Sequence, residues 1–509
     1  MPFPISKETR RIWARRIKGF WYEFSHNKIG LVGLAILIVY LIGAITADII
    51  VKEDPTKAVF LAESFAMPEW MRMFPQYKDL PLTTKISLNW EVSQNFTSET
   101  CSITAEKNQT ANAVVVRYSE NGSTLQPVRF QLYTNATWPY GPPKSFSSRF
   151  SWKAKPGAID TKSTAGYSIE FLVIDPNGKE YPIWDSDYSQ LRLPLPIEPH
   201  TVPIRTPARS GYTDVQTLAG IVQERIGIPI YADAGATVFS KKGNYAFMIE
   251  LTFQPTTTGV EAQNATCVVQ LGIGGFNIPG LVYGLLGCDH LGCDLFQQLI
   301  AGIRISFSIG ILSAAISMFM GILVGVVAGY SGGFVDGALM RMVDILLCLP
   351  VLPLLMALVT LYGQNVYYIV LLIAIFGWQG LSRLIRSQVL SLKEMPFIEC
   401  ARASGGSNFY IMMRHLVPSI LPVALASMVL SVPAAILTEA GLSFIGFGDP
   451  SAPTWGRMLQ RAREWEAFGR MAWWWIIPPG LAITFICVAF VFIGHALDEI
   501  VNPRLRRRR

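Results

Sequence analysis

The chain contains six long, largely apolar segments separated by more polar stretches. Each is close to the roughly 20 residues that cross the hydrocarbon core of a bilayer. The first is too long for a signal peptide and no Ala-x-Ala-type cleavage site follows it, so we interpret it as a retained span. The pattern predicts an α-helical, polytopic membrane protein with six transmembrane helices. The segments are Ile29–Ile50, Ile305–Tyr330, Met342–Tyr362, Tyr367–Leu392, Ile420–Phe447 and Trp475–Leu497.

The connection between the first and second segments is about 250 residues long, which is far too long for a loop. Asp175-Pro176-Asn177-Gly178 is a strong hairpin-turn signal between two strand-like runs. One helix fits Asp214–Ile226. We therefore predict an inserted β-rich domain, a sandwich, over residues 51–284. The runs with strand-like composition are Ala113–Tyr118, Val128–Tyr133, Ser168–Ile174, Tyr181–Trp184, Tyr245–Phe253 and Ala265–Leu271.

Positive charge gathers at the two ends of the chain. The formal net charge is +7, and seven basic residues precede the first span while five arginines close the sequence. By the positive-inside rule both termini are cytoplasmic, which places residues 51–300 or so outside a plasma membrane. This topology accounts for the charge without a nucleic-acid partner. Residues 1–28 also carry aromatic and aliphatic side chains at helical spacing, which predicts a helix on the lipid surface or one packed on the bundle.

Glycosylation sequons and cysteines bear on the same topology. Four cysteines fall in the predicted outer region, and we favour the pairs Cys101–Cys267 across the sandwich and Cys288–Cys293, with four free thiols as the alternative. A zinc site at Cys288, His290 and Cys293 lacks a fourth ligand nearby, so no metal is predicted. All Asn-x-Ser/Thr sequons lie in the inserted domain, at Asn95, Asn108, Asn121, Asn135 and Asn264.

Enzyme motifs are missing from the sequence. It contains no Gly-x-x-x-x-Gly-Lys-Ser/Thr phosphate loop, no His-Glu-x-x-His and no Gly-x-Ser-x-Gly, so we predict no catalytic site and no bound cofactor. Two of the carboxylates inside the apolar segments are candidate site residues. Glu439 either lines a pathway or makes a buried hydrogen bond, and Asp344 is expected near Arg341 at the membrane surface.

A polar, helix-forming island separates the fourth and fifth apolar segments. It contains Glu399, Cys400, Ala401 and Gly405, and Pro418 follows Gly405 by thirteen residues. We predict a water-facing helix at about residues 394–410.

These residues resemble a known family motif. Glu399-Cys400-Ala401-x-x-x-Gly405 with Pro418 is similar to the Glu-Ala-Ala-x-x-x-Gly coupling motif of ABC importer permeases of the dipeptide/oligopeptide class, specifically the second of the two paired permeases. Cys400 replaces an alanine. The segment Leu286–Asp294 resembles another family signature, with cysteines in place of a threonine and an arginine. The resemblance covers roughly residues 1–50 and 285–509.

The resemblance implies a type I ABC importer permease fold over residues 29–50 and 285–509. It implies a homologous second permease, two separate ATPases that bind ATP and Mg, and an extracellular substrate-binding protein as partners. The expected cargo is a di- or oligopeptide, with an oligosaccharide as the alternative. A membrane receptor or scaffold with an extracellular β domain is the alternative from another class. The inserted domain is expected either to help the binding protein dock or to act as a stabilising cap.

Overall fold

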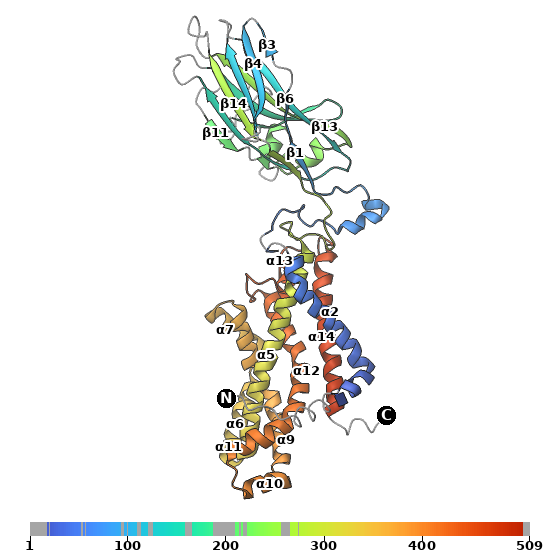
Figure 1. Cartoon of the computed structure of the whole chain (residues 1–509), viewed down its shortest axis with the longest axis vertical. Helices are drawn as coiled ribbons and strands as arrows, with labels where there is room; N and C mark the ends of the chain where they lie inside the picture. Colours follow the sequence, from blue (N-terminus) through green and yellow to red (C-terminus); the bar gives the residue numbers. More distant parts are fainter. Residues whose placement is uncertain are drawn as a thin grey trace. The chain divides into compact units, whose positions relative to one another are not determined.

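A computed structural model of the chain shows two compact units, one comprising Met1–Val59 and Cys293–Arg509 and the other Phe60–Gly292 (Figure 1). Most of the predicted N-terminal helix, residues 1–17 and 20, lies outside the described residues. The structure describes residues 18–19, 21–51, 54–55, 58–92, 96–98, 100–108, 113–120, 126–157, 165–186, 209–212, 215–216, 221–255, 265–272 and 274–501.

The first unit is helical, and its long elements follow the apolar segments of the sequence. A π-helical turn at Met412–Leu416 leads directly into one long helix, Val417–Ile445. The helices are α2 (Lys28–Ile50), α5 (Leu295–Ser331), α6 (Gly333–Cys348), α7 (Val351–Tyr362), α8 (Val366–Ile375), α9 (Gln379–Leu392), α10 (Pro396–Ala403), α11 (Asn408–Ile411), α12 (Val417–Ile445), α13 (Trp455–Glu464) and α14 (Trp473–Val501).

The number of spans differs from the prediction at the third segment. Among the described residues five helical stretches are long and apolar enough to cross a membrane, and α6 and α7 form a sixth only if they count as one span bent by 87°. The break follows from Pro350, because the residue before a proline avoids the helical region. Leu349 is indeed extended, with ψ 136°. The third predicted segment, Met342–Tyr362, is therefore broken into two helices, and the count of six spans stays a prediction.

Helix α5 is the longest helix of the unit and begins earlier than its apolar core suggests. Asp294 caps it, since the carboxylate accepts a hydrogen bond of 2.8 Å from the amide of Phe296. The polar first turns lack the hydropathy of a span, but the cap extends the helix to Leu295 rather than Ile305.

Glycines on α5 allow α9 to approach it closely. A Cβ added to Gly325 would lie 2.7 Å from the carbonyl oxygen of Ser382 and 2.8 Å from Cβ of Ile385. Gly321 and Gly329, one turn away on either side, are equally close to α9 side chains. These three glycines, spaced four residues apart, thus allow close helix packing.

The second unit is built from antiparallel sheets. The strands are β1 (Thr84–Leu88), β2 (Glu91–Val92), β3 (Phe96–Thr97), β4 (Cys101–Asn108), β5 (Ala113–Glu120), β6 (Val128–Trp138), β7 (Ser147–Arg149), β8 (Ser151–Pro156), β9 (Ala165–Ile174), β10 (Glu180–Asp185), β11 (Arg209–Tyr212), β12 (Val215–Gln216), β13 (Gly243–Pro255), β14 (Thr266–Gly272) and β15 (Gly274–Ile278). All six predicted strands are present, four of them to within two residues at their ends, while β6 extends five residues further and β9 begins three residues earlier than predicted.

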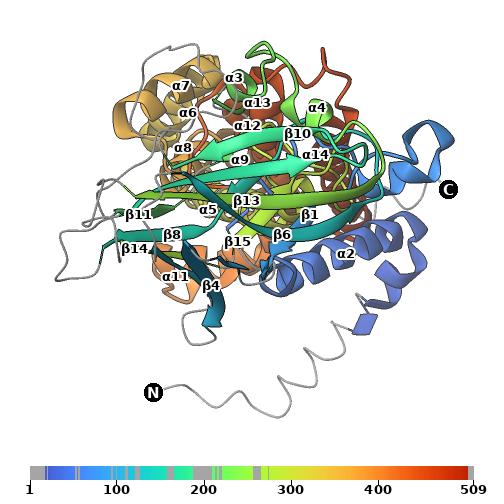
Figure 2. The ribbon, with the colours of Figure 1, turned by 90° about the horizontal axis from the view of Figure 1, so that it is seen from above.

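Two sheets pack face to face as the predicted sandwich. The five-stranded sheet has the order β10-β9-β13-β6-β2 and the six-stranded sheet β11-β8-β14-β5-β4-β3; Figure 2 shows β10, β13 and β6 in this order. The buried ring of Tyr118 on β5 stacks on Phe253 of β13 at 5.1 Å between centroids. Alternate residues of both sheets supply the apolar core between them.

A third, four-stranded sheet was not predicted, and it joins the two ends of the insertion. Its order is β1-β15-β7-β12, and Thr84 of β1 pairs with Ile278 of β15. The chain therefore enters and leaves the unit on neighbouring strands, as an inserted domain requires. The predicted helix over Asp214–Ile226 is wrong near its start, because Val215–Gln216 forms β12; among the described residues of this range, Ile221–Arg225 (α3) is helical.

The predicted hairpin turn joins β9 and β10. The Asp175 side chain accepts hydrogen bonds from the amides of Asn177 (2.9 Å) and Lys179 (2.8 Å). Gly178 has φ +83°, a conformation that favours glycine. The turn thus satisfies its own backbone, as the sequence indicates.

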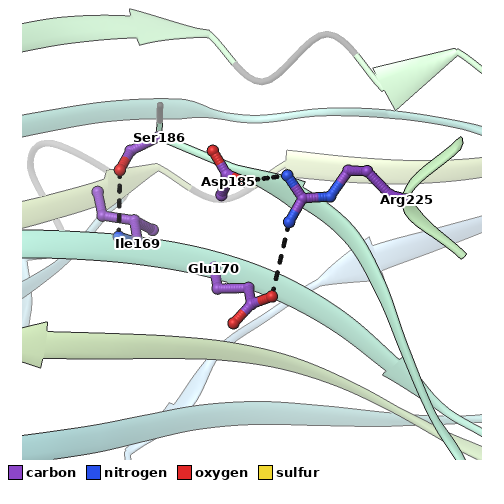
Figure 3. Close-up of polar contacts among 5 residues, drawn as sticks. All are labelled: Ile169, Glu170, Asp185, Ser186 and Arg225. Atoms are coloured by element: carbon purple, nitrogen blue, oxygen red, sulfur yellow. Dashed lines mark hydrogen bonds and ion pairs between the residues drawn. The ribbon is translucent and has the colours of Figure 1, made fainter. Parts of the chain in front are cut away.

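A buried ion cluster lies beside this hairpin (Figure 3). Arg225 of α3 forms an ion pair with Asp185 of β10, and its second terminal nitrogen lies 3.6 Å from a carboxylate oxygen of Glu170 on β9. The two acids are cross-strand neighbours, and about a tenth of each of the three side chains is exposed. The arginine therefore joins a short helix to two strands where solvent screens the charges little.

Candidate functional site

The polar island predicted at about residues 394–410 forms a short exposed helix between two apolar helices. Helix α10 starts at Pro396, directly after the extended Met395, and Glu399 lies in its first turn. A carboxylate there interacts favourably with the positive end of the helix dipole. The side chains of Glu399 and Cys400 are exposed, whereas Ala401 is half-buried.

Gly405 ends this helix in a way that explains the spacing of the motif. Its φ is +80°, in the left-handed region. The amide of Gly405 donates to the carbonyl of Arg402 and the amide of Gly406 to that of Ala401, both at 3.0 Å. These two bonds define a Schellman motif, which stops a helix where a glycine reverses the chain.

The inner face of α10 is fixed to the bundle through a single fully buried side chain. Ile398 has no exposed surface and packs in a cluster with Val326 of α5, Val389 of α9 and Ile420 of α12. Ile411 of α11 joins the same cluster. Ile398 thus joins α10 to an apolar core that α5, α9 and α12 share. The sequence reasoning missed Ile398, although its apolar side chain in a polar island is a signal for such an anchor.

The outer face of α10 borders a surface hollow of about 730 Å³. The ring of His415 lies between those of Phe397 and Tyr410, at centroid distances of 6.4 Å and 5.7 Å. The hollow thus combines exposed aromatic surface with small residues. Its lining residues are Phe397, Cys400, Ala401, Ser404, Gly405, Gly406, Ser407, Tyr410 and His415.

Pro418, the last member of the predicted motif, lies outside this hollow. It is the second residue of α12, in the first turn of that helix. Its place follows the π-helical turn Met412–Leu416, so it marks the start of the long helix.

Of the two predicted intramembrane charges, Glu439 is buried within this chain. Only 2% of it is exposed, and its carboxylate accepts a hydrogen bond of 2.6 Å from Ser443 and contacts Thr454. Thr454 also caps α13. Glu439 therefore joins α12 to α13, as in the buried hydrogen-bond alternative.

Asp344 is not buried, and its partner is not Arg341. It forms an ion pair with Arg383 of α9, and more than half of each side chain is exposed. Nearby, Arg386 of α9 binds both carboxylate oxygens of Asp336 on α6, each at 2.5 Å. Two arginines of α9 thus form ion pairs with α6. Each pair joins residues about forty or fifty positions apart in the sequence, so it forms only in the folded bundle.

The structure contradicts one of the two predicted disulfides and leaves the other a prediction. Cys101 and Cys267 are free and buried, on strands β4 and β14 of the same sheet with β5 between them. A bond across the two sheets is therefore wrong, since both residues belong to one sheet. Burial raises the pKa of the Cys267 thiol to about 12, which makes it unreactive. Cys288 and Cys293 are both buried, and their pairing stays a prediction.

One of the five predicted glycosylation sites can be placed fully. Asn135 is exposed on β6. Asn108 ends β4, but its side chain, like the whole of Asn95, Asn121 and Asn264, lies outside the described residues. Within the described part of the chain no group of three or more His, Cys, Asp or Glu residues could hold a metal ion.

Long apolar helices and a short exposed helix anchored between them define a multi-pass membrane protein of the permease class. Residues 321–507 match the family described as binding-protein-dependent transport system inner membrane component. Residues 16–68 match the N-terminal TM domain of oligopeptide transport permease C. The chain belongs to this family of ABC transporter permeases.

Known proteins resemble the helical part of the chain. The dipeptide transport system permease protein DppC of Bacillus subtilis is 34% identical over 45% of this chain and 72% of its own length. The glutathione transport system permease protein GsiD of Pectobacterium atrosepticum is 35% identical over 43% and 73%. OppC of Haemophilus influenzae, an oligopeptide transport system permease protein, is 35% identical over 44% and 71%.

Among solved structures, a chain of the MetNI methionine ABC transporter aligns with 41% of this chain and 96% of its own, at 17% identity and a TM-score of 0.32. That likeness is too low to bear on the fold.

Proposed function

We propose that this chain, together with a homologous permease, forms the translocation pathway of an ATP-driven importer of di- and oligopeptides. The observation that carries the proposal is α10, an exposed helix that holds the coupling motif and is tied to the bundle by buried Ile398. Two separate ATPases dock at α10 and bind ATP and Mg, and an extracellular binding protein delivers the cargo. The chain itself binds no cofactor.

Helix α10 transmits motion because it is a rigid part of a larger packed body. Ile398 shares its cluster with α5, α9 and α12, so closure of the ATPase dimer displaces these helices together. A packed interface that has two arrangements responds in this all-or-none way. ATP binding then favours one arrangement by its differential affinity.

The topology of the proposed importer has both termini in the cytoplasm and the β-rich unit outside a plasma membrane. Exposed Asn135 in the β-rich unit suits an outer location, because a sequon must be accessible to be glycosylated. In this arrangement the β-rich unit helps the binding protein dock.

Docking at α10 is tested by reversing the charge of Glu399. We expect Glu399→Lys to leave membrane insertion intact but to prevent co-purification of the ATPases, because it places a cation at the positive end of α10 and on the docking surface. Gly405→Trp should do the same by disrupting the left-handed end of the helix. Glu464→Lys, at an exposed side chain of α13, is the control. ATPases that co-purify equally with all three variants would show that α10 is not the docking helix.

The cargo class is tested with the assembled complex in lipid nanodiscs. The names of the relatives favour peptides, so we expect a peptide-loaded binding protein to raise ATP hydrolysis and an oligosaccharide-loaded one to leave it at the basal rate. The reverse result would assign the oligosaccharide alternative and leave the docking of ATPases untouched.

A further inference from the structure

The turn that joins α13 to α14 exposes large apolar side chains in an ordered loop. Phe468 is 83% exposed and Met471 is 77% exposed. Trp465 and Trp473, at the two ends of the turn, are about half exposed. Such a concentration of exposed apolar surface in nine residues indicates a surface that contacts something other than water.

The turn holds these side chains outward by its own hydrogen bonds. Glu466 and Met471 both have left-handed backbones, with φ 53° and 58°, which is uncommon for residues other than glycine. The residue after each of them donates a backbone hydrogen bond to an earlier carbonyl. The amide of Ala467 donates to the carbonyl of Ala462, and the amide of Ala472 donates to the carbonyl of Ala467, both at 2.8 Å. Buried alanines therefore fix the turn, and the large side chains project outward.

The exposed surface continues onto an apolar stripe of α14. Ile477, Leu481 and Phe485 follow Trp473 at intervals of four residues, and each is about half exposed. Residues at this spacing share one face of a helix. Since α14 is long and apolar enough to cross a membrane, this face continues directly from the span into the turn. Charged Glu466 and Arg470 between the apolar residues give the turn the mixed character of the lipid headgroup region.

We propose that residues 465–473 form an interfacial anchor that sits in the headgroup region of the bilayer and holds the start of α14 at a set depth. Phe468 and Met471 enter the boundary between headgroups and acyl chains, while the two tryptophans lie at headgroup level. The anchor also sets the level of α13, whose buried Trp455 donates a hydrogen bond of 3.0 Å to the carbonyl of Leu299 on α5. This proposal does not depend on the identity of the cargo.

The test places a fluorescent bimane on Phe468→Cys and, separately, on Met471→Cys, in the whole transporter in nanodiscs. Exposed Cys348 and Cys400 are replaced by serine. We expect lipids with a doxyl quencher near the headgroup to cause a large loss of emission and aqueous iodide to cause little. Tyr231→Cys, at a side chain that is 90% exposed in the β-rich unit, is the control and should respond to iodide alone.

Two outcomes would overturn the proposal. Quenching of the turn by iodide and not by lipid would show a water-exposed loop. Protection from both quenchers would show that another subunit or the binding protein covers the turn.

Discussion

The replacement of Ile398 by alanine tests how α10 is attached to the bundle. Ile398 is fully buried, and a buried Ile→Ala change costs about 2–5 kcal/mol, because it removes apolar contacts and leaves a cavity. If this cost falls only on the packing of α10 against the bundle, the fraction of molecules in which α10 is detached rises by about 30-fold for 2 kcal/mol and by a few thousandfold for 5 kcal/mol. Phe397→Ala is the matched control on the same helix, since its half-exposed ring should contribute only about 1 kcal/mol.

Hydrogen exchange measures this detachment directly. The amides of Ser404, Gly405 and Gly406 are all bonded to carbonyls of α10, so they exchange only when the end of the helix opens. We expect a peptide that covers residues 399–406 to exchange faster in Ile398→Ala by the factor above, with little change in Phe397→Ala. Equal exchange in both variants and the wild type would refute the assignment of Ile398 as the anchor. If the proposed function holds, ATP hydrolysis in Ile398→Ala should also lose its dependence on cargo.

Further predictions concern stability. Gly325→Ala should lower the free energy of unfolding by about 1–3 kcal/mol, because the added Cβ meets a backbone carbonyl. The control Gly337→Ala places its Cβ in open space on α6 and should not lower it. Equal melting temperatures of the two variants would contradict the close packing. Arg225→Met should destabilise the β-rich unit by about 3–5 kcal/mol by leaving two buried carboxylates without their cation. The control Arg129→Met removes a pair whose arginine is 60% exposed and should cost less than about 1 kcal/mol; equal losses of protection against hydrogen exchange would argue against the buried cluster. Burial raises the pKa of Asp175, but hydrogen bonds from the turn outweigh it and leave the pKa below its usual value. The ionised Asp175 therefore contributes its full stabilisation above the ordinary carboxyl pKa of about 3.9, and this stabilisation is lost as the pH falls through the lowered pKa. Asp175→Asn should therefore make the free energy of unfolding depend less on pH at acid pH. An unchanged dependence would exclude this role.

The features that could be predicted from the sequence are those that depend on neighbours along the chain. Hydropathy marked the spans because about 20 apolar residues suffice to cross a bilayer. The turn Asp175–Gly178 was confirmed because its hydrogen bonds lie within five residues. The coupling motif likewise encodes a local event, a helix that begins at a proline and ends at a left-handed glycine.

Other features were decided only by the tertiary structure, because they depend on residues far apart in sequence. Pro350 predicts that the helix breaks in the third segment, but the 87° angle between α6 and α7 could not be predicted from the sequence. The even number of cysteines suggested a disulfide between Cys101 and Cys267 across the sandwich, but the strand order places both in one sheet with β5 between them. Glu439 could be recognised as a buried charge, but its contact with Thr454 across helices could not. Ile398 is one apolar residue in a polar island, and only the meeting of α5, α9 and α12 makes it the anchor of α10.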